Sequence, residues 1–340
     1  MSIGFIRGRE VQPQFAIFGK VARRDDFVRV NADHSAVVDF DTLLGKSLAW
    51  SSAEPGWTDE SYLARGCSEF HFGSDDGRSA FFGVLRPSRD RAGRLYPLVA
   101  GVVLPALRVG SLDAERAVAN ELFLLGLREQ LDSAVANASE LIACRQYLEA
   151  HVALLAGRAS DFELASTVLA RHLHRTPAAS LQRDLLDATR GPLEAHLLAF
   201  LFYVSLARRY AGSAPRQVML LPLPARAGED ALGWGAWLAL YRAATRVQGA
   251  PIPQGFVVEL AGRRYLALAP HGLSERFLGL LWGRPPDAPS VIDMHDDTSP
   301  WCRHHAYVEA AYILGGQLAD PSLSLHGLCG ILEQLACSIG

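Results

Sequence analysis

Positive charge, paired cysteines and long apolar runs are all scarce in this sequence of 340 residues. Its 33 Lys and Arg residues are outnumbered by 36 Asp and Glu residues, which gives a formal net charge of −3. A general nucleic-acid-binding protein normally carries a basic domain. The charge balance therefore argues against that class, although it leaves room for a local basic patch.

The cysteines do not form a recognisable framework. There are five of them, irregularly spaced, and none belongs to a C-x-x-C pair. This pattern is typical of reduced and mostly buried thiols in a cytosolic protein, and not of a disulfide scaffold or a zinc site.

Apolar runs are too short for a membrane helix, which needs about 20 residues. The longest ones are residues 97–107 and 195–207, and the second has the apolar period of a buried core helix. The first 15 residues contain no apolar run of the kind found in a signal peptide. We therefore expect a soluble, cytoplasmic protein without direct membrane insertion.

What the sequence does contain is a globular composition, with 49% hydrophobic and 20% charged residues. The first hundred residues alternate between short apolar runs and one helical period. Turn clusters at 73–77 and 87–93 are too short for parallel crossovers, so they predict an antiparallel meander. The expected elements are strands at 15–18, 69–72, 79–86 and 95–105 and a helix at 36–49.

The remainder predicts a helical stretch and then a second mixture of strands and helices. Strands are expected at 217–223 and 255–270, the latter with a hairpin turn at 261–263, and helices at 230–246, 274–283, 304–319 and 324–337. The predicted fold class is α+β, with an antiparallel sheet flanked by helices, similar to a longin or profilin. The regions are 1–110 (α+β), 111–212 (helical) and 213–340 (a second, small α+β part).

Common catalytic and cofactor motifs are missing. Gly45-Lys46-Ser47 ends like a P-loop, but Phe40 stands where that signature needs glycine. Neither G-x-G-x-x-G nor G-x-S-x-G occurs. We therefore predict no cofactor and no catalytic residues, hence a protein that is not an enzyme.

One group of metal-binding residue types leaves an alternative open. His295, Asp296 and Asp297 precede His304, and together they could serve a metal-dependent hydrolase. Adjacent ligands on a helix diverge, however, so the neighbouring pair of His304 and His305 cannot face one ion together. The main prediction includes no metal.

Two charged stretches, residues 19–29 and 83–98, are unusual. The second has four arginines between Arg86 and Arg94, with Asp90 among them. They are either solvated loops, a face that binds a partner, or an Arg–Asp network that locks the loops together. Arginine binds carboxylates with two parallel hydrogen bonds, so Arg91 or Arg94 could hold Asp25 or Asp26.

In order and content, these stretches resemble the TagF (ImpM) family of type VI secretion system-associated proteins. The family pattern has an aromatic-Gly-Lys strand end, here Phe18-Gly19-Lys20, and then Asp26-Phe27-Val28-Arg29. A Gly-Val-Leu-x-Pro-Ser-x-Asp-x-x-Gly-Arg-x-x-Pro-Leu block follows. It is matched by Gly83, Val84, Leu85, Pro87, Ser88, Asp90, Gly93, Arg94, Pro97 and Leu98.

The match has departures. The usual Leu-Pro-x-x-Gly loop is replaced by Val21-Ala22-Arg23-Arg24-Asp25, so its backbone path should differ. Phe40-Asp41 stands where the family has Trp-Asp. The resemblance covers about residues 14–105, and no phosphatase domain is fused to it.

The resemblance implies a non-enzymatic regulator that represses type VI secretion after translation. The implied partner is the forkhead-associated scaffold protein of the system. An assembly accessory required for secretion is the alternative. We expect Arg94 to lock the loops, and Arg86, Arg89 and Arg91 to face a partner. The candidate residues for partner binding or a structural polar network are Gly19, Lys20, Arg23, Asp26, Phe27, Arg29, Arg86, Pro87, Ser88, Arg89, Asp90, Arg91, Gly93 and Arg94.

Overall fold

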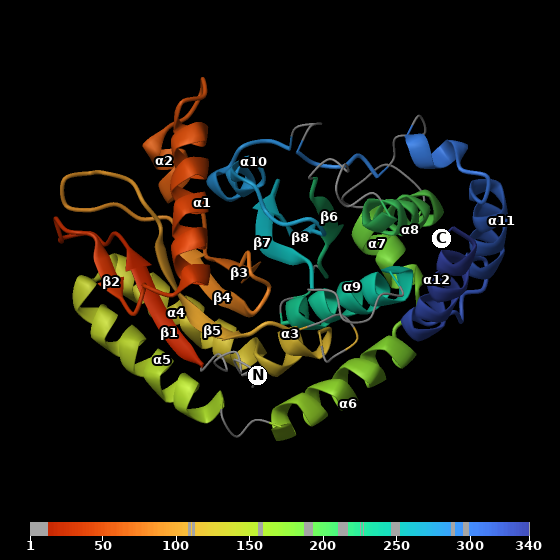
Figure 1. Ribbon diagram of the computed structural model, residues 1–340, viewed down its shortest axis with the longest axis horizontal. Helices are drawn as coiled ribbons and strands as arrows, with labels where there is room; N and C mark the ends of the chain where they lie inside the picture. Colours follow the sequence, from red (N-terminus) through yellow and green to blue (C-terminus); the bar gives the residue numbers. More distant parts are fainter. Residues whose placement is uncertain are drawn as a thin grey trace, which may run out of the picture.

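A single antiparallel sheet of eight strands, in the order β2-β1-β5-β4-β3-β7-β8-β6, organises the computed structural model (Figure 1). The structure describes residues 13–107, 110, 113–155, 159–186, 193–209, 217–224, 226, 228–245, 252–286, 290–294 and 299–339. The strands are β1 (Gln14–Gly19), β2 (Val28–Val30), β3 (Ser68–Gly73), β4 (Ser79–Arg86), β5 (Leu98–Pro105), β6 (Met219–Pro222), β7 (Gln254–Leu260) and β8 (Arg263–Ala269). The α+β class and the β3-β4-β5 meander are confirmed.

Strands from both ends of the chain belong to this sheet. β3 pairs with β7 through Phe70 opposite Phe256 and His71 opposite Gly255. From the sequence, the C-terminal strands are predicted to form a second, small α+β part. In the structure β7, β8 and β6 continue the N-terminal sheet, because β3 offers its free edge to β7.

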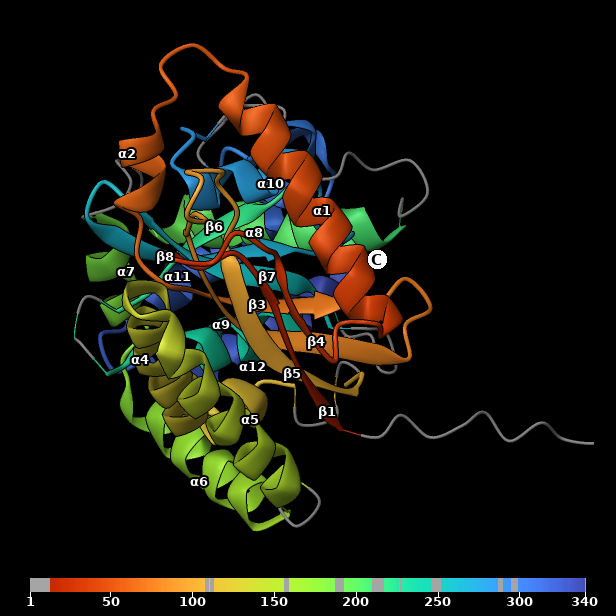
Figure 2. The ribbon, with the colours of Figure 1, turned by 90° about the vertical axis from the view of Figure 1, so that its left-hand side faces the viewer.

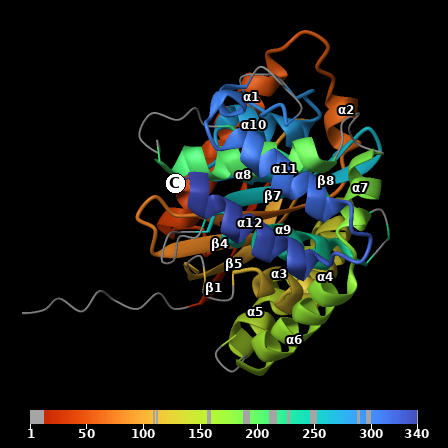
Figure 3. The same ribbon diagram turned by 90° about the vertical axis from the view of Figure 1, so that its right-hand side faces the viewer.

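Helices cover both faces of the sheet (Figures 1 and 2). The helices α1 and α10 cover one face, whereas α4 and α5 cover the opposite face of the N-terminal strands. Helices α3, α6, α8 and α9 pack beside the C-terminal strands, with α11 and α12 outermost (Figure 3). Their bounds are α1 (Ser35–Ser52), α2 (Asp59–Leu63), α3 (Glu115–Ala119), α4 (Glu121–Ala136), α5 (Leu141–Leu155), α6 (Ala159–Arg175), α7 (Ala179–Leu186), α8 (Leu193–Arg209), α9 (Asp230–Thr245), α10 (Glu275–Leu278), α11 (Tyr307–Leu318) and α12 (Leu325–Ile339).

Strand β4 shows why a separate hydrophobic core forms on each face of the N-terminal strands. Successive side chains of a strand point to opposite faces, and a strand covered on both faces is apolar throughout. Phe81 lies 5.8 Å from Phe40 of α1, measured between ring centroids, and Phe82 lies 5.8 Å from Phe123 of α4. Each of these adjacent phenylalanines therefore belongs to a different core.

Some elements differ from the sequence predictions. β2 and α2 are too short to give a clear period. The predicted strand at 95–105 begins only at Leu98, because Leu95 and Tyr96 fold back onto Arg89 and Ser88. Residues 274–283 split into α10 and a 3₁₀ turn. None of the helices in the described residues is long and apolar enough to cross a membrane.

Candidate functional site

The two charged loops lie against each other, beyond the ends of β1 and β4. Nε and Nη2 of Arg91 contact the two carboxylate oxygens of Asp25 at 3.0 and 2.7 Å. The backbone N–H of Arg91 donates to the carbonyl of Arg24 at 2.9 Å. The Arg–Asp contact expected from the sequence is formed, and it is two-pronged.

Asp90 is the buried centre of this arrangement. Its side chain is 0% exposed, and it accepts hydrogen bonds from the backbone N–H (2.8 Å) and Nε (2.7 Å) of Arg94. Lys20 Nζ lies 3.3 Å from the same carboxylate. Burial raises the pKa of Asp90, but the hydrogen bonds from Arg94 and Lys20 outweigh it and hold the pKa at about 2. Asp90 is therefore ionised at neutral pH.

Arg94 ties the two loops together, but from the surface. Its Nη2 donates to the backbone carbonyl of Asp25 at 2.6 Å, while its side chain stays 62% exposed. The lock thus has a buried carboxylate at its centre and a half-solvated arginine above it. Gly93 reverses the chain between them with φ of 84°.

Gly19 allows the loops to approach. Its φ is +127°, and a Cβ at this position would lie 2.0 Å from the carbonyl oxygen of Pro97. Only glycine fits both conditions. In the loop that follows, which lacks the family's Pro and Gly, the left-handed residue is Arg23, with φ of 71°.

Asp41 and Tyr96 extend the network, although neither was among the predicted site residues. The hydroxyl of Tyr96 donates to the carboxylate of Asp41, which also pairs with Arg29. The ring of Phe27 packs edge-on against Tyr96, with 5.2 Å between centroids. Burial, and then Asp41, raise the pKa of Tyr96. The sequence could have indicated Asp41, because it occupies a position of the family pattern. Nothing in the sequence indicated Tyr96, because its partner lies on α1, far away along the chain.

The other predicted residues divide between structure and surface. Arg86 pairs with Asp132 of α4 at 3.1 Å, so it joins the sheet to a helix. Pro87 and Ser88 are buried, and the Ser88 N–H donates to the hydroxyl of Tyr62 at 3.4 Å. The remaining members, fully at the surface, are Arg23, Asp26 and Arg89.

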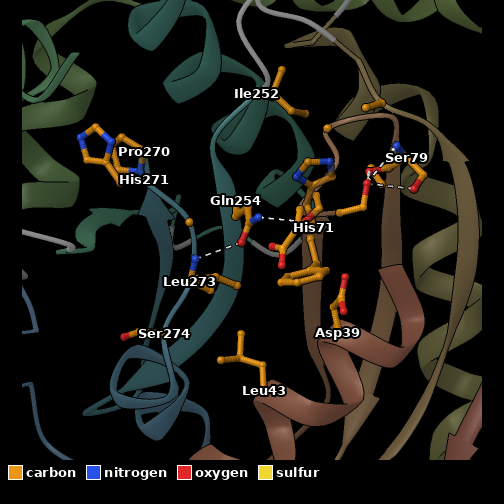
Figure 4. Close-up of a pocket in the computed structure, with 18 of the residues that line it drawn as sticks. Asp39, Leu43, His71, Ser79, Ile252, Gln254, Pro270, His271, Leu273 and Ser274 are labelled. Atoms are coloured by element: carbon orange, nitrogen blue, oxygen red, sulfur yellow. Dashed lines mark hydrogen bonds between the residues drawn. The ribbon is translucent and has the colours of Figure 1, made fainter. Parts of the chain in front are cut away.

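A cavity of about 740 Å³ opens elsewhere, between α1 and residues 270–275 (Figure 4). Gln254 spans it, because its Nε2 donates to the carbonyl of Gly73 at 3.0 Å and its Oε1 accepts from the N–H of Leu273 at 2.9 Å. Asp39 lies at the rim, and burial together with Asp75 and Asp76 raises its pKa. The cavity marks where β3 and β7 diverge, and the sequence gave no sign of it.

The alternative metal site cannot be described as a unit. His295, Asp296 and Asp297 lie outside the described residues, and the ring of His304 packs 5.5 Å from that of Phe202. Within the part of the chain that the structure describes, no group of three or more His, Cys, Asp or Glu is arranged to hold a metal ion.

The protein is of the α+β class. In its N-terminal part, the loops after β1 and β4 carry the residues of the TagF pattern, and these loops are bound to each other. Residues 16–151 match the family model described as the TagF N-terminal domain, type VI secretion system-associated. The chain therefore contains, over residues 16–151, a region that matches the TagF N-terminal domain. The resemblance found in the sequence is confirmed.

One solved structure is similar over part of its length. PA0076 from Pseudomonas aeruginosa PAO1 is 26% identical, with a TM-score of 0.32. The match covers 40% of this chain and 61% of that chain, which is less than two thirds of PA0076. No curated protein matches the chain.

Proposed function

We propose that this protein is a cytoplasmic, non-enzymatic regulator that lowers type VI secretion after translation. It does so by binding the forkhead-associated scaffold protein of the system and blocking assembly. The observation that carries the proposal is the TagF domain over residues 16–151, with its motif side chains bound to one another. Because these side chains bind one another, they keep the two loops in one conformation, and a binding protein requires such a fixed surface.

The locked loops supply that surface. Arg23, Arg24 and Arg89 are exposed beside the Arg91–Asp25 pair. Because the loops are already ordered, a partner bound there does not bear the full entropy cost of ordering them. The exposed arginines favour an acidic partner surface, since complementary charge raises the association rate and rejects wrong partners.

Repression then follows from occupancy. A binding protein shifts an equilibrium only by its different affinities for the two states. We infer that this protein binds the scaffold more tightly in the state that cannot recruit the secretion machine. Tight binding to both states alike would repress nothing.

Deletion and overexpression in the native cell test the proposal. We expect deletion to raise secretion and overexpression to lower it, with transcript levels of the secretion genes unchanged. A fall in secretion on deletion would make the protein an assembly accessory instead. Unchanged secretion under inducing conditions would contradict both.

A pull-down of the scaffold by the purified full chain tests the surface. The full chain is needed because β3 and β7 share one sheet. We expect Arg89→Glu to weaken scaffold binding at least tenfold, and Arg171→Glu, an exposed arginine on α6, to leave it unchanged. Equal binding by both variants would place the contact surface elsewhere on the molecule.

A further inference from the structure

A groove of about 430 Å³, which we call the α1 groove, lies between α1, the start of α2 and the loop between β4 and β5. The residues that line it include Leu48, Ala49, Ser52, Trp57, Asp59 and Leu95. Those from α1 lie within about one turn of each other, so they form one face of the helix. The groove therefore borders directly on one of the two locked loops.

Two large apolar side chains form the walls of the α1 groove, and both are held in place from behind. The ring of Trp57 lies 5.6 Å from the ring of the buried Tyr62, measured between centroids. Leu95 is fixed by a β-bridge to Arg89. A partner that binds between these walls does not bear the full entropy cost of ordering them.

The same β-bridge places a positive charge on the groove side of the loop. Tyr96 donates its N–H to the carbonyl of Ser88, and Asp90 donates its N–H to the carbonyl of Arg94. Arg89 and Leu95 are therefore directly opposite each other as a non-hydrogen-bonded pair, and their side chains project from the same face of this short hairpin.

Neighbouring positions in the hairpin point to its other face, and they include Asp90 and Arg94, which form the lock. Arg89 is exposed and forms no ion pair within the part of the chain that the structure describes. The hairpin thus uses one face to hold the loops together and presents an apolar and a cationic side chain on the other.

The shape of the α1 groove favours a segment of a larger partner over a small molecule. Small-molecule sites usually enclose about 70–90% of their ligand. Here the residues Ala49 and Ser52 on α1 are exposed, so one side of the groove is open to solvent. A bound group would therefore leave one side uncovered unless the rest of a protein partner lay over it.

Charge differs between the two sides of the groove. Asp59 and Glu60 are exposed acids just beyond Trp57, whereas Arg89 is the exposed cation beside Leu95. Because like charges repel and unlike charges attract across an interface, an acidic residue of a partner is favoured near Arg89 and disfavoured near Asp59. The charges therefore select both the chemistry of the segment and its orientation.

We propose that the α1 groove binds a peptide segment of a protein partner. A large apolar side chain of the segment enters between Trp57 and Leu95, and acidic side chains next to it reach Arg89. Tryptophan and arginine are enriched among the residues that dominate binding energy at interfaces. The binding chemistry does not depend on the regulatory role, but the assignment of the segment to the scaffold rests on the proposed function.

Fluorescence anisotropy with labelled peptides tests the groove on the full chain. The capped peptides Gly-Gly-Phe-Asp-Glu and Glu-Asp-Phe-Gly-Gly cover both chain directions. We expect saturable binding of at least one of them. Replacing its Phe with Ser should weaken binding at least tenfold, and replacing its acids with Asn and Gln should weaken it at least threefold, because exposed ion pairs contribute less.

Variants of the protein locate the binding site. Ala49→Trp fills the groove from an exposed position of α1 and should abolish binding of the peptide. Val38→Trp, also exposed on α1 but outside the groove, is the matched control and should bind normally. Ser52→Trp replaces Ala49→Trp if that variant does not fold. No saturable binding to the wild type, or normal binding by a folded variant with a filled groove, would overturn the proposal.

The purified scaffold protein then separates this inference from the proposed function. Loss of scaffold binding in Ala49→Trp, with Val38→Trp unaffected, assigns the segment to the scaffold and supports both. If the peptide binds in the groove but the wild type does not bind the scaffold, the proposed function fails and the groove inference stands. If the scaffold binds to a protein that fails the peptide test, the groove inference fails alone.

Discussion

Nζ of Lys20 and the carboxylate of Asp90 lie 3.3 Å apart, and this contact joins the end of β1 to the loop between β4 and β5. Asp90 also binds Arg94, which reaches the carbonyl of Asp25 in the first loop. Two segments far apart in sequence are therefore held through one buried carboxylate. The predictions begin with that residue.

Asp90→Asn should destabilise the protein more than any substitution of a single cation around it. The variant removes the negative charge that Lys20 and Arg94 share and replaces one acceptor oxygen with an amide donor, which leaves both cations without their carboxylate. Urea unfolding of Asp90→Asn and Arg94→Ala compares them directly. A larger loss in Arg94→Ala would show that the lock is not centred on Asp90.

Arg94→Ala should cost about 1–2 kcal/mol of unfolding free energy. It removes charged hydrogen bonds to Asp90 and Asp25, but the side chain is 62% exposed and solvent screens both contacts. The loss of about 3–5 kcal/mol that is typical of breaking a buried ion pair is not expected, because the Arg94 side chain is exposed. Thermal or urea unfolding measures the difference, and Arg171→Ala serves as the exposed control.

The contribution of Asp90 to stability should depend on pH in the acid range. Its pKa falls from 3.8 to about 2 on folding, so the unfolded chain binds the proton more readily. Its contribution is then complete above the unfolded value and is lost as pH falls through the folded one. Unfolding free energies of the wild type and Asp90→Asn should converge as pH falls from 4 to 2. A constant gap across that window would contradict the assignment.

Gln254→Ala should lower stability by about 1–3 kcal/mol. The side chain serves two backbone groups, the carbonyl of Gly73 and the N–H of Leu273, which lose their partner together. Gln317→Ala, at an exposed position on α11, is the matched control and should change little. Equal urea midpoints for the two variants would mean that Gln254 does not hold the cavity together.

Gly19→Ala should cost at least about 3 kcal/mol, since φ is unfavourable for alanine and the Cβ would overlap the Pro97 carbonyl. Gly316→Ala is the opposite case. Gly316 lies in α11, and no atom lies within 4 Å of the added Cβ. The substitution should therefore raise the free energy of unfolding by about 0.5–1 kcal/mol. Melting curves of both variants check the contrast.

Local patterns in the sequence predicted the individual elements well. The apolar spacing of Val37, Phe40, Leu44 and Leu48 gave α1, because one face of a helix repeats every three or four residues. Short turns gave the β3-β4-β5 meander. The pairing of β3 with β7 could not be predicted, because periodicity carries no record of partners so distant in sequence.

The candidate site was foreseen in the same uneven way. Opposite charges predicted that Arg91 or Arg94 would reach Asp25 or Asp26. Both arginines reach Asp25, Arg91 through the carboxylate and Arg94 through the backbone carbonyl. Tyr96 and Asp41 meet only because the loop before β5 folds against α1, and the Gln254 cavity forms only because β7 joins the sheet. Contacts that depend on how elements pack leave no local signal.

The pairing of β3 with β7 also bears on synthesis at the ribosome. The strand β4, which pairs with one edge of β3, emerges from the ribosome directly after β3. The strand β7, which pairs with the other edge, emerges only after the long helical stretch that separates β3 from β7 in the sequence. At 5–20 residues per second, that interval lasts on the order of ten seconds or more. Throughout it the nascent chain displays an unpaired strand edge, which is a template for wrong pairing. The architecture is thus most vulnerable to misfolding during translation, when the β3 edge is unpaired, and we expect the nascent chain to depend on chaperones at that stage.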